Sequence, residues 1–261
     1  KVPGVHLEGP FINPNCLGAQ NPDYVRKPDI EEVKRLNAIF PVIKVSYAVE
    51  TEGGPEFASE LNANGIVPSC VHSAAAFAQF MEGNKRGLKN LSHFCNQMTP
   101  LHHREIGMVG AGFLIEDLNT EVIADKIHLC PDMLRLVFTR RNLAHVQIIT
   151  DSLRCSHCKD GYAFEMGGLK VKLENGEARL VEGGNLAGST LWMGTGLKNV
   201  HDVTGLPLKD LVRTTSWNQA IELGWGDSLG KVEKGYTADL VVINPKSWKP
   251  SAVFVEGEQR I

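Results

Sequence analysis

Four short apolar stretches of the chain each end in a side chain that can bind a metal or carry a proton. They are VHLE ending at Glu8, GIVPSCVH ending at His72, LKNLSH ending at His93, and HVQIITD ending at Asp151. In an α/β barrel the carboxyl ends of the parallel strands meet at one face, where the active site forms. One glutamate, two histidines and one aspartate at successive strand ends therefore predict a metal-dependent hydrolase built on a (β/α) barrel.

Strand-like and helix-like patterns alternate through the first 150 residues. The expected strands are 2–7, 42–48, 65–71, 90–93, 122–128 and 146–150, and the expected helices are 28–40, 56–64, 73–82 and 131–141. The helical period is clearest where Ile30, Val33, Leu36 and Ile39 recur. Alternation of this kind predicts parallel strands joined by right-handed crossovers.

Only six such strands are visible, whereas a closed barrel has eight. An unclosed barrel would leave two long strand edges exposed. The chain also starts at Lys1 without an initiator methionine and runs at once into a strand of the buried type. We therefore expect a fragment that lacks its N-terminal strands, and an inactive truncation is one hypothesis for the chain.

The pattern changes after Asp151. The segment near 161–180 alternates polar and apolar residues around Asn175-Gly176, which predicts a β-hairpin inserted after the last barrel strand. Segments 188–203 and 207–223 have helical patterns, and 238–243 and 252–255 have strand patterns. Two strands are not stable alone. We expect a barrel over 1–228 and, over 229–261, the C-terminal strands of a small β-sandwich domain.

Composition is that of an ordinary soluble enzyme. The 261 residues are 43% hydrophobic and 22% charged, with a net charge of −3 and a pI near 6.3. This balance gives no general attraction to nucleic acid or membrane surfaces. No apolar run reaches the roughly 18 residues of a membrane span. Six scattered cysteines suit a reducing cytoplasm better than a disulfide framework, so we expect a cytoplasmic protein.

At this point the chain resembles a known family. The motifs that carry the resemblance are HLEGPF at 6–11, GAQNP at 18–22, VHSAA at 71–75, SHFCNQM at 92–98, Arg104-Glu105, Thr150-Asp151 and GKVEKGYTADLV at 230–241. In this order and spacing they are similar to the N-acetylglucosamine-6-phosphate deacetylases of the amidohydrolase superfamily. The resemblance implies a distorted (β/α)₈ barrel with a small β-sandwich built from both chain ends.

The resemblance also implies a metal centre. Glu8, His72 and His93 match the ligands of one divalent ion, zinc or iron(II), with an open position for water. The superfamily's early His-X-His position is absent from these residues, so the existence of a second metal site stays open. The alternative for each histidine is a hydrogen-bonding role at a strand end.

The same comparison assigns proton transfer to Asp151, which would take a proton from the metal-bound water and return it to the leaving amine. The alternative for Asp151 is a helix N-cap. By resemblance, His128 follows a strand end, contacts the sugar and helps to polarise the acetyl carbonyl.

Substrate contacts follow by resemblance as well. Arg104 matches a phosphate-binding arginine that reaches into a neighbouring subunit's site, which predicts a homodimer, and Asn96 and Gln97 would add donors to the phosphate. The positions expected to line the sugar are Ala19, Leu186, Ala187 and Gly188. His102 and His103 are expected to be solvated loop residues.

Three features depart from the pattern or lie outside it. Gln97 stands beside Asn96 where a small residue is common, and Lys126 stands where a glycine is expected, so both bear on substrate preference. Cys155 and Cys158 form a Cys-X-X-Cys pair. A structural zinc site needs four ligands and no second pair is present, so a packing role is favoured over zinc or redox chemistry.

The sequence therefore predicts hydrolysis of the acetamide of N-acetylglucosamine 6-phosphate, giving glucosamine 6-phosphate and acetate. A second hypothesis keeps the metal centre and changes the substrate to another N-acylated amino sugar or a cyclic amide.

Overall fold

The structure is a computed structural model that describes residues 2–261, and it separates into two compact units. The first unit runs to Glu121 and continues from Asp151 to Thr190. The second contains Val122–Thr150 and Leu191–Ile261. The division into units groups the residues that contact one another most. It does not test the expected domain boundary at 228/229, which stays a prediction.

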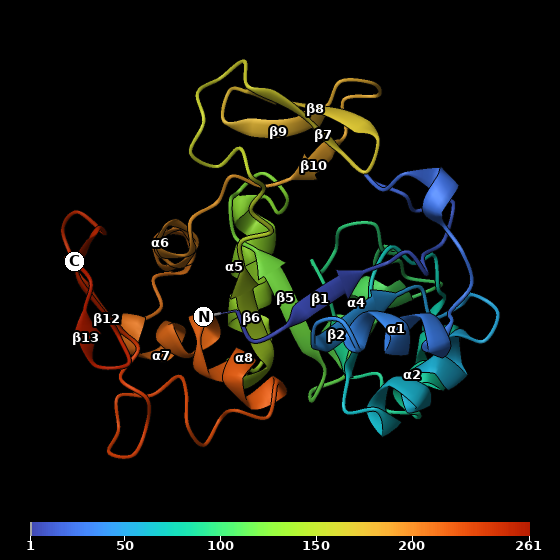
Figure 1. Ribbon diagram of the computed structural model, residues 1–261, viewed down its shortest axis with the longest axis horizontal. Helices are drawn as coiled ribbons and strands as arrows, with labels where there is room; N and C mark the ends of the chain where they lie inside the picture. Colours follow the sequence, from blue (N-terminus) through green and yellow to red (C-terminus); the bar gives the residue numbers. More distant parts are fainter. Residues whose placement is uncertain (1) are drawn as a thin grey trace. The chain divides into compact units, whose positions relative to one another are not determined.

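The first unit contains the parallel strands that the sequence pattern indicates (Figure 1). They are β1 (Val5–Glu8), β2 (Val42–Tyr47), β3 (Val67–Cys70), β4 (Asn90–Leu91) and the start of β5 (Asn119–Ile123). They pair in chain order, with Glu8 beside Ser46 and Tyr47 beside Cys70. This register brings the residues that follow β1, β3 and β4 to one edge of the sheet.

Helices connect these strands, as expected from the alternating pattern. They are α1 (Ile30–Asn37), α2 (Gly54–Ala63), α3 (Phe77–Asn84) and α4 (Gly107–Leu114), with a 3-10 turn η1 at Pro22–Tyr24. The side chain of Asp29 caps α1 by accepting from the backbone N–H groups of Glu31 and Glu32. The sequence analysis missed α4, because its glycines hide the helical period. A side chain at Gly112 would meet the Phe94 ring at 2.3 Å, which explains one of these glycines.

A small antiparallel sheet follows Asp151. It consists of β7 (Ala163–Met166), β8 (Leu169–Glu174), β9 (Glu177–Leu180) and β10 (Leu186–Gly188). The expected hairpin is confirmed as β8 and β9, joined at Asn175-Gly176, where both residues have positive φ. The expected helix at 188–203 is wrong at its start, because Gly188 ends β10 and the helix begins five residues later.

The second unit carries the end of β5 and the last strand of the main sheet, β6 (Val146–Ile149). Its helices are α5 (Pro131–Arg140), α6 (Met193–Thr204), α7 (Leu208–Leu211) and α8 (Trp217–Glu222), with 3-10 turns η2 (Leu143–His145) and η3 (Val212–Thr215). The expected strand 122–128 is wrong at its end. β5 stops at Ile123, so His128 lies in a loop rather than at a strand end.

The C-terminal strands also lie in the second unit. β11 (Leu240–Ile243), β12 (Pro250–Val255) and β13 (Glu258–Gln259) form an antiparallel meander. The strands expected at 238–243 and 252–255 are therefore confirmed. Their partly exposed faces suit strands of a larger β layer.

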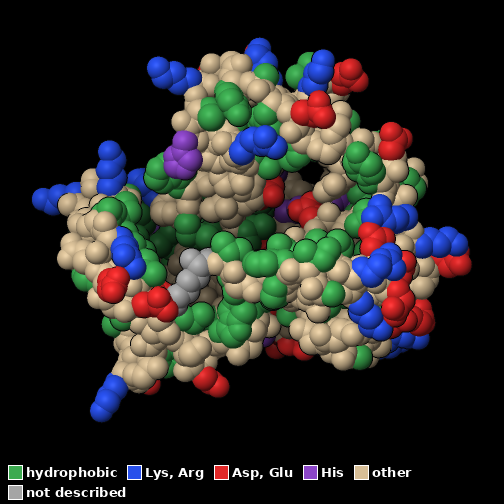
Figure 2. Space-filling model, viewed as in Figure 1, with side chains coloured by type: hydrophobic (Ala, Val, Ile, Leu, Met, Phe, Trp, Pro, Cys, Tyr) green, Lys and Arg blue, Asp and Glu red, His purple; other side chains and the backbone are tan. Residues whose placement is uncertain are grey.

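The surface mixes charges of both signs. In the face shown in Figure 2, lysine and arginine side chains lie interspersed with acidic ones. No helix among the described residues is both long enough and apolar enough to cross a bilayer. Among the free cysteines, Cys70 is buried, whereas Cys130 is exposed just before α5.

Aromatic packing holds β1 and β2 against α2. The Phe57 ring of α2 meets Phe11 at 5.4 Å and Tyr47 at 5.1 Å between ring centroids, both edge to face. All three side chains are almost completely buried. Such pairs add about 0.5–1.5 kcal/mol each beyond the burial of apolar surface. This cluster fixes the backbone next to Glu8.

Replacing Phe57 by alanine should therefore lower the free energy of unfolding by about 3–5 kcal/mol, because a buried ring is lost and its cavity cannot fully collapse. Denaturant unfolding followed by circular dichroism measures the change. Ile39→Ala is the matched control, since this side chain is 82% exposed and its loss should change stability little. Equal effects of the two substitutions would contradict the packing described here.

Candidate metal centre

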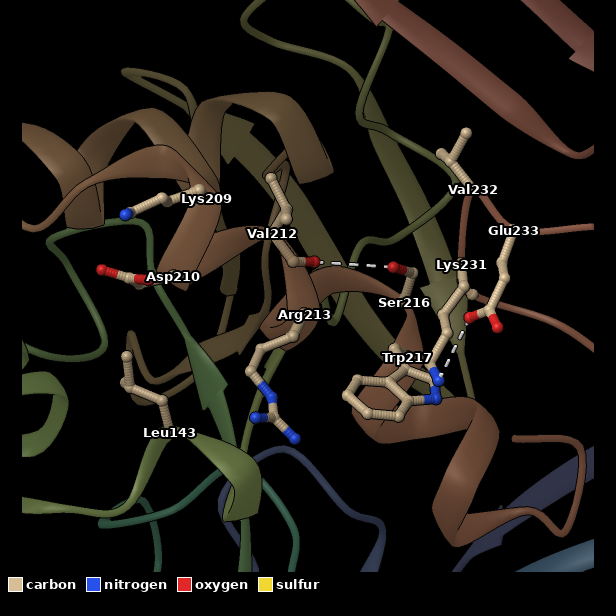
Figure 3. A pocket seen from close by; sticks show the side chains of 11 residues that line it. Leu143, Lys209, Asp210, Val212, Arg213, Ser216, Trp217, Lys231, Val232 and Glu233 are labelled. Atoms are coloured by element: carbon tan, nitrogen blue, oxygen red, sulfur yellow. Dashed lines mark hydrogen bonds and ion pairs between the residues drawn. The ribbon is translucent and has the colours of Figure 1, made fainter. Parts of the chain in front are cut away.

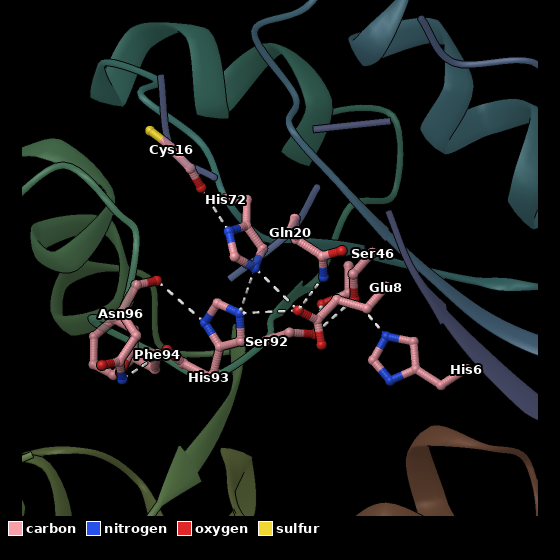
Figure 4. A network of polar contacts seen from close by, with 11 residues as sticks. His6, Glu8, Cys16, Gln20, Ser46, His72, Ser92, His93, Phe94 and Asn96 are labelled. Carbon is pink, nitrogen blue, oxygen red and sulfur yellow. Dashed lines mark hydrogen bonds and ion pairs between the residues drawn. The ribbon is translucent and has the colours of Figure 1, made fainter. Parts of the chain in front are cut away.

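Three side chains from the ends of β1, β3 and β4 converge on one point (Figure 4). Glu8 Oε1 lies 3.0 Å from His72 Nε2 and 3.6 Å from His93 Nε2. The two Nε2 atoms lie 3.2 Å apart. All three atoms fall within 4.8 Å of one another, the spacing of ligands around a single ion. The set predicted from sequence is therefore brought together.

Backbone carbonyls fix the tautomer of both histidines. His72 Nδ1 lies 2.6 Å from the carbonyl oxygen of Cys16, and His93 Nδ1 lies 3.1 Å from that of Asn96. A carbonyl can only accept, so each Nδ1 carries the hydrogen and each neutral ring keeps an electron pair on Nε2. Metal-bound histidines are held in the same way.

Three electron-pair donors thus face one another with no hydrogen between them. Such an arrangement is repulsive unless a proton or a metal cation lies among the donors. Without a metal, a proton on the imidazoles would take this part: burial by itself would disfavour charge on Glu8, but hydrogen bonds from the protonated His72 and His93 rings would hold the pKa of this carboxyl well below its usual value. Burial also opposes protonation of His93, but the hydrogen bond and charge of Glu8, together with the charge of Asp151, raise the His93 pKa. The residues fit a divalent cation bound by one carboxylate and two imidazoles.

The three side chains of the candidate metal site differ in their exposure to solvent. The side chains of His72 and His93 are 6% and 8% exposed, whereas that of Glu8 is 33% exposed. The protein therefore surrounds the two imidazoles and leaves the carboxylate side open. An open side is what a catalytic site needs for water and substrate, unlike a closed structural site.

The backbone is strained at the residues that face this site. His72 has φ of 44°, His93 of 33° and Asp151 of 50°, all in the left-handed region. For residues other than glycine this conformation costs about 1–2 kcal/mol each. Strain of this kind clusters at functional sites, where the surrounding structure holds it in place.

Glu50 braces the loops on either side of His72. Its carboxylate accepts from the Asn13 side chain at 2.7 Å, from the Ser73 hydroxyl at 2.5 Å and from the Ala74 N–H at 2.6 Å. It thereby ties the segment after β1 to the segment after β3. This contact helps to hold the strained backbone at His72.

A buried polar layer lies on the inner side of the strands. Ser92 Oγ is 2.8 Å from both Ser46 Oγ and Ser69 Oγ, and Lys44 Nζ lies 2.7 Å from Glu121 Oε1. Burial opposes charge on Glu121, but Lys44 outweighs it and lowers the pKa of the carboxyl. Truncating one partner of such a pair would leave a buried charge alone, which costs about 3–5 kcal/mol.

Asp151 lies in the same unit as the three ligands. Its carbonyl accepts from Ser189 N–H at 2.7 Å, which ties Asp151 to the residue that follows β10. Its negative charge acts on His93 and contributes to the raised pKa of that imidazole. The predicted proton carrier is therefore within electrostatic reach of the predicted ligands.

The residues expected to contact phosphate follow His93. Asn96 holds His93 through its carbonyl, and its amide donates to the His93 carbonyl at 3.2 Å. Gln97 has φ of 50°, which explains why a small residue suits this position. Arg104 is exposed on the loop before α4, and His102 and His103 are exposed beside it, as expected.

The residues expected to line the sugar also come together in part. Ala19 packs against a buried cluster that includes Ala187 of β10. The Asn185 side chain donates to the carbonyl of Gly18 at 3.2 Å. The small sheet is thus tied to the loop that follows β1. Leu186 and Gly188 flank Ala187 in the same strand.

His128 lies in the second unit, beside Asp125. Asp125 Oδ2 is 2.6 Å from His128 Nδ1, and Asp125 Oδ1 accepts from the N–H groups of Ile127 and His128 at 2.8 Å. The carboxylate therefore fixes Nδ1–H and leaves Nε2 as the free ring nitrogen. Lys126 between them has φ of 68°, the conformation for which the expected glycine is suited.

Comparison with known proteins identifies the family. The model of the family described as "Amidohydrolase family" matches residues 1–260. The chain belongs to the amidohydrolase family. Amidohydrolases depend on metal ions, and the convergence of Glu8, His72 and His93 supplies this chain with a candidate site.

Individual relatives carry related names. The N-acetylglucosamine-6-phosphate deacetylase of Bacillus subtilis (strain 168) is 36% identical over 92% of this chain and 61% of its own length. The N-acetylgalactosamine-6-phosphate deacetylase of Escherichia coli O157:H7 is 32% identical over 94% of this chain and 64% of its own length. The chain thus spans about three fifths of the length of these curated relatives.

A solved structure confirms the fold class. The crystal structure of N-acetylglucosamine-6-phosphate deacetylase from Thermotoga maritima matches with a TM-score of 0.92 and 38% identity. The match covers 98% of this chain and 69% of that chain. The parallel strands described here are part of a TIM-like barrel of the amidohydrolase type.

Sequence reasoning missed several residues that support this amidohydrolase site. Gln20 Nε2 donates to Glu8 Oε1 at 3.2 Å, and a side chain at Gly18 would lie 3.1 Å from the His72 ring. Glu50 holds the segment after His72 through hydrogen bonds, and Asp125 holds the His128 ring through another within the second unit. Gln20 and Gly18 both fall in the GAQNP segment at 18–22, a motif that could have flagged them.

Both cysteines of the Cys155–Cys158 pair lie outside the metal-binding group that is found among residues 2–261. Among the described residues, the group with metal-binding geometry is the one around Glu8, and both cysteines are free thiols. Cys155 is buried among apolar residues, and burial raises the pKa of its thiol, which makes it less reactive. These features agree with a packing role for Cys155.

Replacing Gln20 by alanine should weaken metal binding about 10-fold, because a lost hydrogen bond to a ligand typically costs 10–100-fold in affinity. Competition with a chromophoric chelator measures the dissociation constant. Gln259→Ala is the control, since Gln259 lies in the exposed strand β13. An unchanged constant in Gln20→Ala would show that this amide does not support Glu8.

Proposed function

We propose that this amidohydrolase removes the acetyl group of N-acetylglucosamine 6-phosphate, giving glucosamine 6-phosphate and acetate. The observation that carries the proposal is the convergence of Glu8, His72 and His93 near Asp151, in a chain whose relatives are named as deacetylases of this kind. Because the chain spans about three fifths of those relatives, activity on this substrate is an inference that the experiments below test.

The ligand set suits zinc or iron(II). Bound there, the ion would activate a water molecule near neutral pH and polarise the acetyl carbonyl. The protein's own part is to keep Nε2 of both imidazoles deprotonated and aimed, through the carbonyls of Cys16 and Asn96. The open side at Glu8 leaves room for the acetamide.

Asp151 is the proposed general base and acid. Amide hydrolysis requires a proton to leave the attacking water and to reach the leaving nitrogen, and one carboxylate beside the ligands can do both in turn. The left-handed backbone at Asp151 supports this role, because strain of this kind is retained where a side chain must be aimed.

Substrate orientation is assigned to groups away from the reacting bond. Arg104, with Asn96 and Gln97, would hold the phosphate, while Ala19 and Leu186–Gly188 would border the sugar. Binding energy from the phosphate then positions the acetamide at the metal. His128 would contact the sugar and stabilise charge on the carbonyl oxygen through Nε2, since Asp125 occupies Nδ1.

The proposal also includes the oligomeric state of the enzyme and its location in the cell. Arg104 is exposed on its loop, which suits an arginine that completes the site of a second copy in a homodimer. We place the enzyme in the cytoplasm, because its substrate is a phosphorylated metabolite and its cysteines are free thiols.

A second substrate is favoured by one comparison. The relative from Escherichia coli O157:H7 is named for N-acetylgalactosamine 6-phosphate. The two sugars differ only in the orientation of one hydroxyl, so the same metal chemistry would serve both. The ratio of kcat/KM for the two compounds decides between them, and the proposal expects the glucosamine compound to be preferred.

Replacing Asp151 by asparagine should lower kcat for acetate release by a factor of roughly 10²–10⁴, because asparagine cannot carry the proton. Metal content, measured by plasma emission, should stay the same. Asp227→Asn, at an exposed position, is the control and should keep full activity. Full turnover by Asp151→Asn would refute the assigned role.

Replacing Arg104 by alanine should raise KM for N-acetylglucosamine 6-phosphate by at least about 10-fold, since a charge-assisted contact to phosphate is lost. The slow reaction with unphosphorylated N-acetylglucosamine should be unaffected. Arg86→Ala is the control, because Arg86 pairs with Glu56 and Glu82 away from the site. Equal losses on both substrates would exclude a phosphate contact.

A further inference from the structure

The second unit holds a cavity that the proposed deacetylation does not use (Figure 3). It has a volume of about 650 Å³ and lies between η3, α7 and the loop at 230–233. Its charged and aromatic lining consists of Lys209, Asp210, Arg213, Trp217, Lys231 and Glu233. This volume is in the range of sites that hold small organic molecules.

The Trp217 ring forms the platform of this cavity. Its indole N–H donates to the carbonyl of Gly226 at 3.3 Å, so the polar edge is satisfied and the ring is fixed. The Arg213 guanidinium carbon lies 4.9 Å from the ring centre, and Lys231 Nζ lies 4.1 Å from it. Two positive charges are therefore held beside one ring.

Arg213 is held in place from the protein interior. Its Nε donates to Asn218 Oδ1 at 2.9 Å, and Asn218 is only 2% exposed. Asn218 in turn donates to the carbonyls of Leu143 and Val146 at 2.6 and 2.7 Å. The two terminal nitrogens of Arg213 have no carboxylate partner among residues 2–261. They form a fork that is positioned in advance for an anion.

Lys231 reaches the ring because of the residue before it. Gly230 has φ of 88°, and a side chain there would lie 2.7 Å from the Trp217 backbone. The glycine lets the loop pack closely on α8 and carries Lys231 over the indole. Its nearest carboxylate, Glu233, is 3.6 Å away, a long contact that leaves the ammonium able to bind another anion.

We propose that this cavity binds a small phosphate monoester with a hydroxyl-bearing body, such as a sugar phosphate. Arg213 and Lys231 would bind the phosphate oxygens, because both are cations that line the cavity and the planar guanidinium matches the oxygens of a phosphate. The body of the ligand would lie in the remaining space of the cavity, beside Trp217. Asp210 and Glu233, on opposite sides of the view in Figure 3, would accept from its hydroxyl groups.

This site is independent of the metal centre. None of its lining residues is a proposed ligand, proton carrier or phosphate contact of the deacetylase, and the cavity lies wholly within the second unit. The proposal therefore stands or falls without the proposed function. Part of its sequence is the GKVE start of the 230–241 motif, for which the deacetylase mechanism has no role.

Nuclear magnetic resonance of the four indole groups tests the site, using ¹⁵N-labelled protein with glucose 6-phosphate and inorganic phosphate as probes. The Trp217 signal is assigned by its loss in Trp217→Phe. We expect this signal to shift in a saturable way with glucose 6-phosphate. The dissociation constant should rise at least about 10-fold in Arg213→Met and in Lys231→Met, as expected when a charge-assisted contact is removed. Circular dichroism checks that both variants fold.

Two control variants make the outcome decisive. Lys159→Met, an exposed cation of the first unit, should leave the titration unchanged. Arg104→Ala should also leave it unchanged, because binding at the metal centre is a separate event. A Trp217 signal that does not move, or that moves equally in Arg213→Met, would overturn the proposal. Equal affinity for inorganic phosphate and glucose 6-phosphate would overturn the role assigned to Asp210 and Glu233.

Discussion

Two imidazole nitrogens held 3.2 Å apart, both facing one carboxylate oxygen, form the constraint on which the rest of this structure depends. The carbonyls of Cys16 and Asn96 take the only ring hydrogens, so no neutral state of His72 and His93 relieves the repulsion. A cation resolves it. Burial strengthens the requirement, because water cannot separate the donors.

The fold supplies this geometry by placing the ligands at or just beyond the ends of the parallel strands β1, β3 and β4. The register of β1, β2 and β3 aligns those ends, and the left-handed backbone at His72 and His93 turns the side chains inward. This backbone costs energy, which packing around it must offset. The Phe57 cluster and the Glu50 carboxylate provide such support next to β1 and β3.

Much of this arrangement could be predicted from sequence, because short apolar strands are visible as patterns and their polar ends stand out. The strands before Glu8, His72 and His93 followed from their short apolar runs, and the helix at α1 followed from its period. The true end of β5 did not, because the apolar residues at 127 and 129 continue the strand pattern through a loop. Helix α4 was hidden by glycines that close packing requires.

Supporting contacts were the least predictable part of the site. The pairing of Asp125 with His128 and of Gln20 with Glu8 depends on side-chain directions that a linear pattern does not encode. The positive φ angles at the site residues are likewise a property of the folded backbone. Sequence therefore indicated the residues to which the proposal assigns the chemistry, and the structure adds how the three proposed ligands are aimed.

The most direct test of this account is to measure metal content and acetate release from N-acetylglucosamine 6-phosphate on one purified sample, for the natural chain and for His72→Ala. The account predicts about one divalent ion per chain together with acetate release, and the loss of both in the variant. Acetate release that persists in a metal-free His72→Ala sample would contradict the central role of this site.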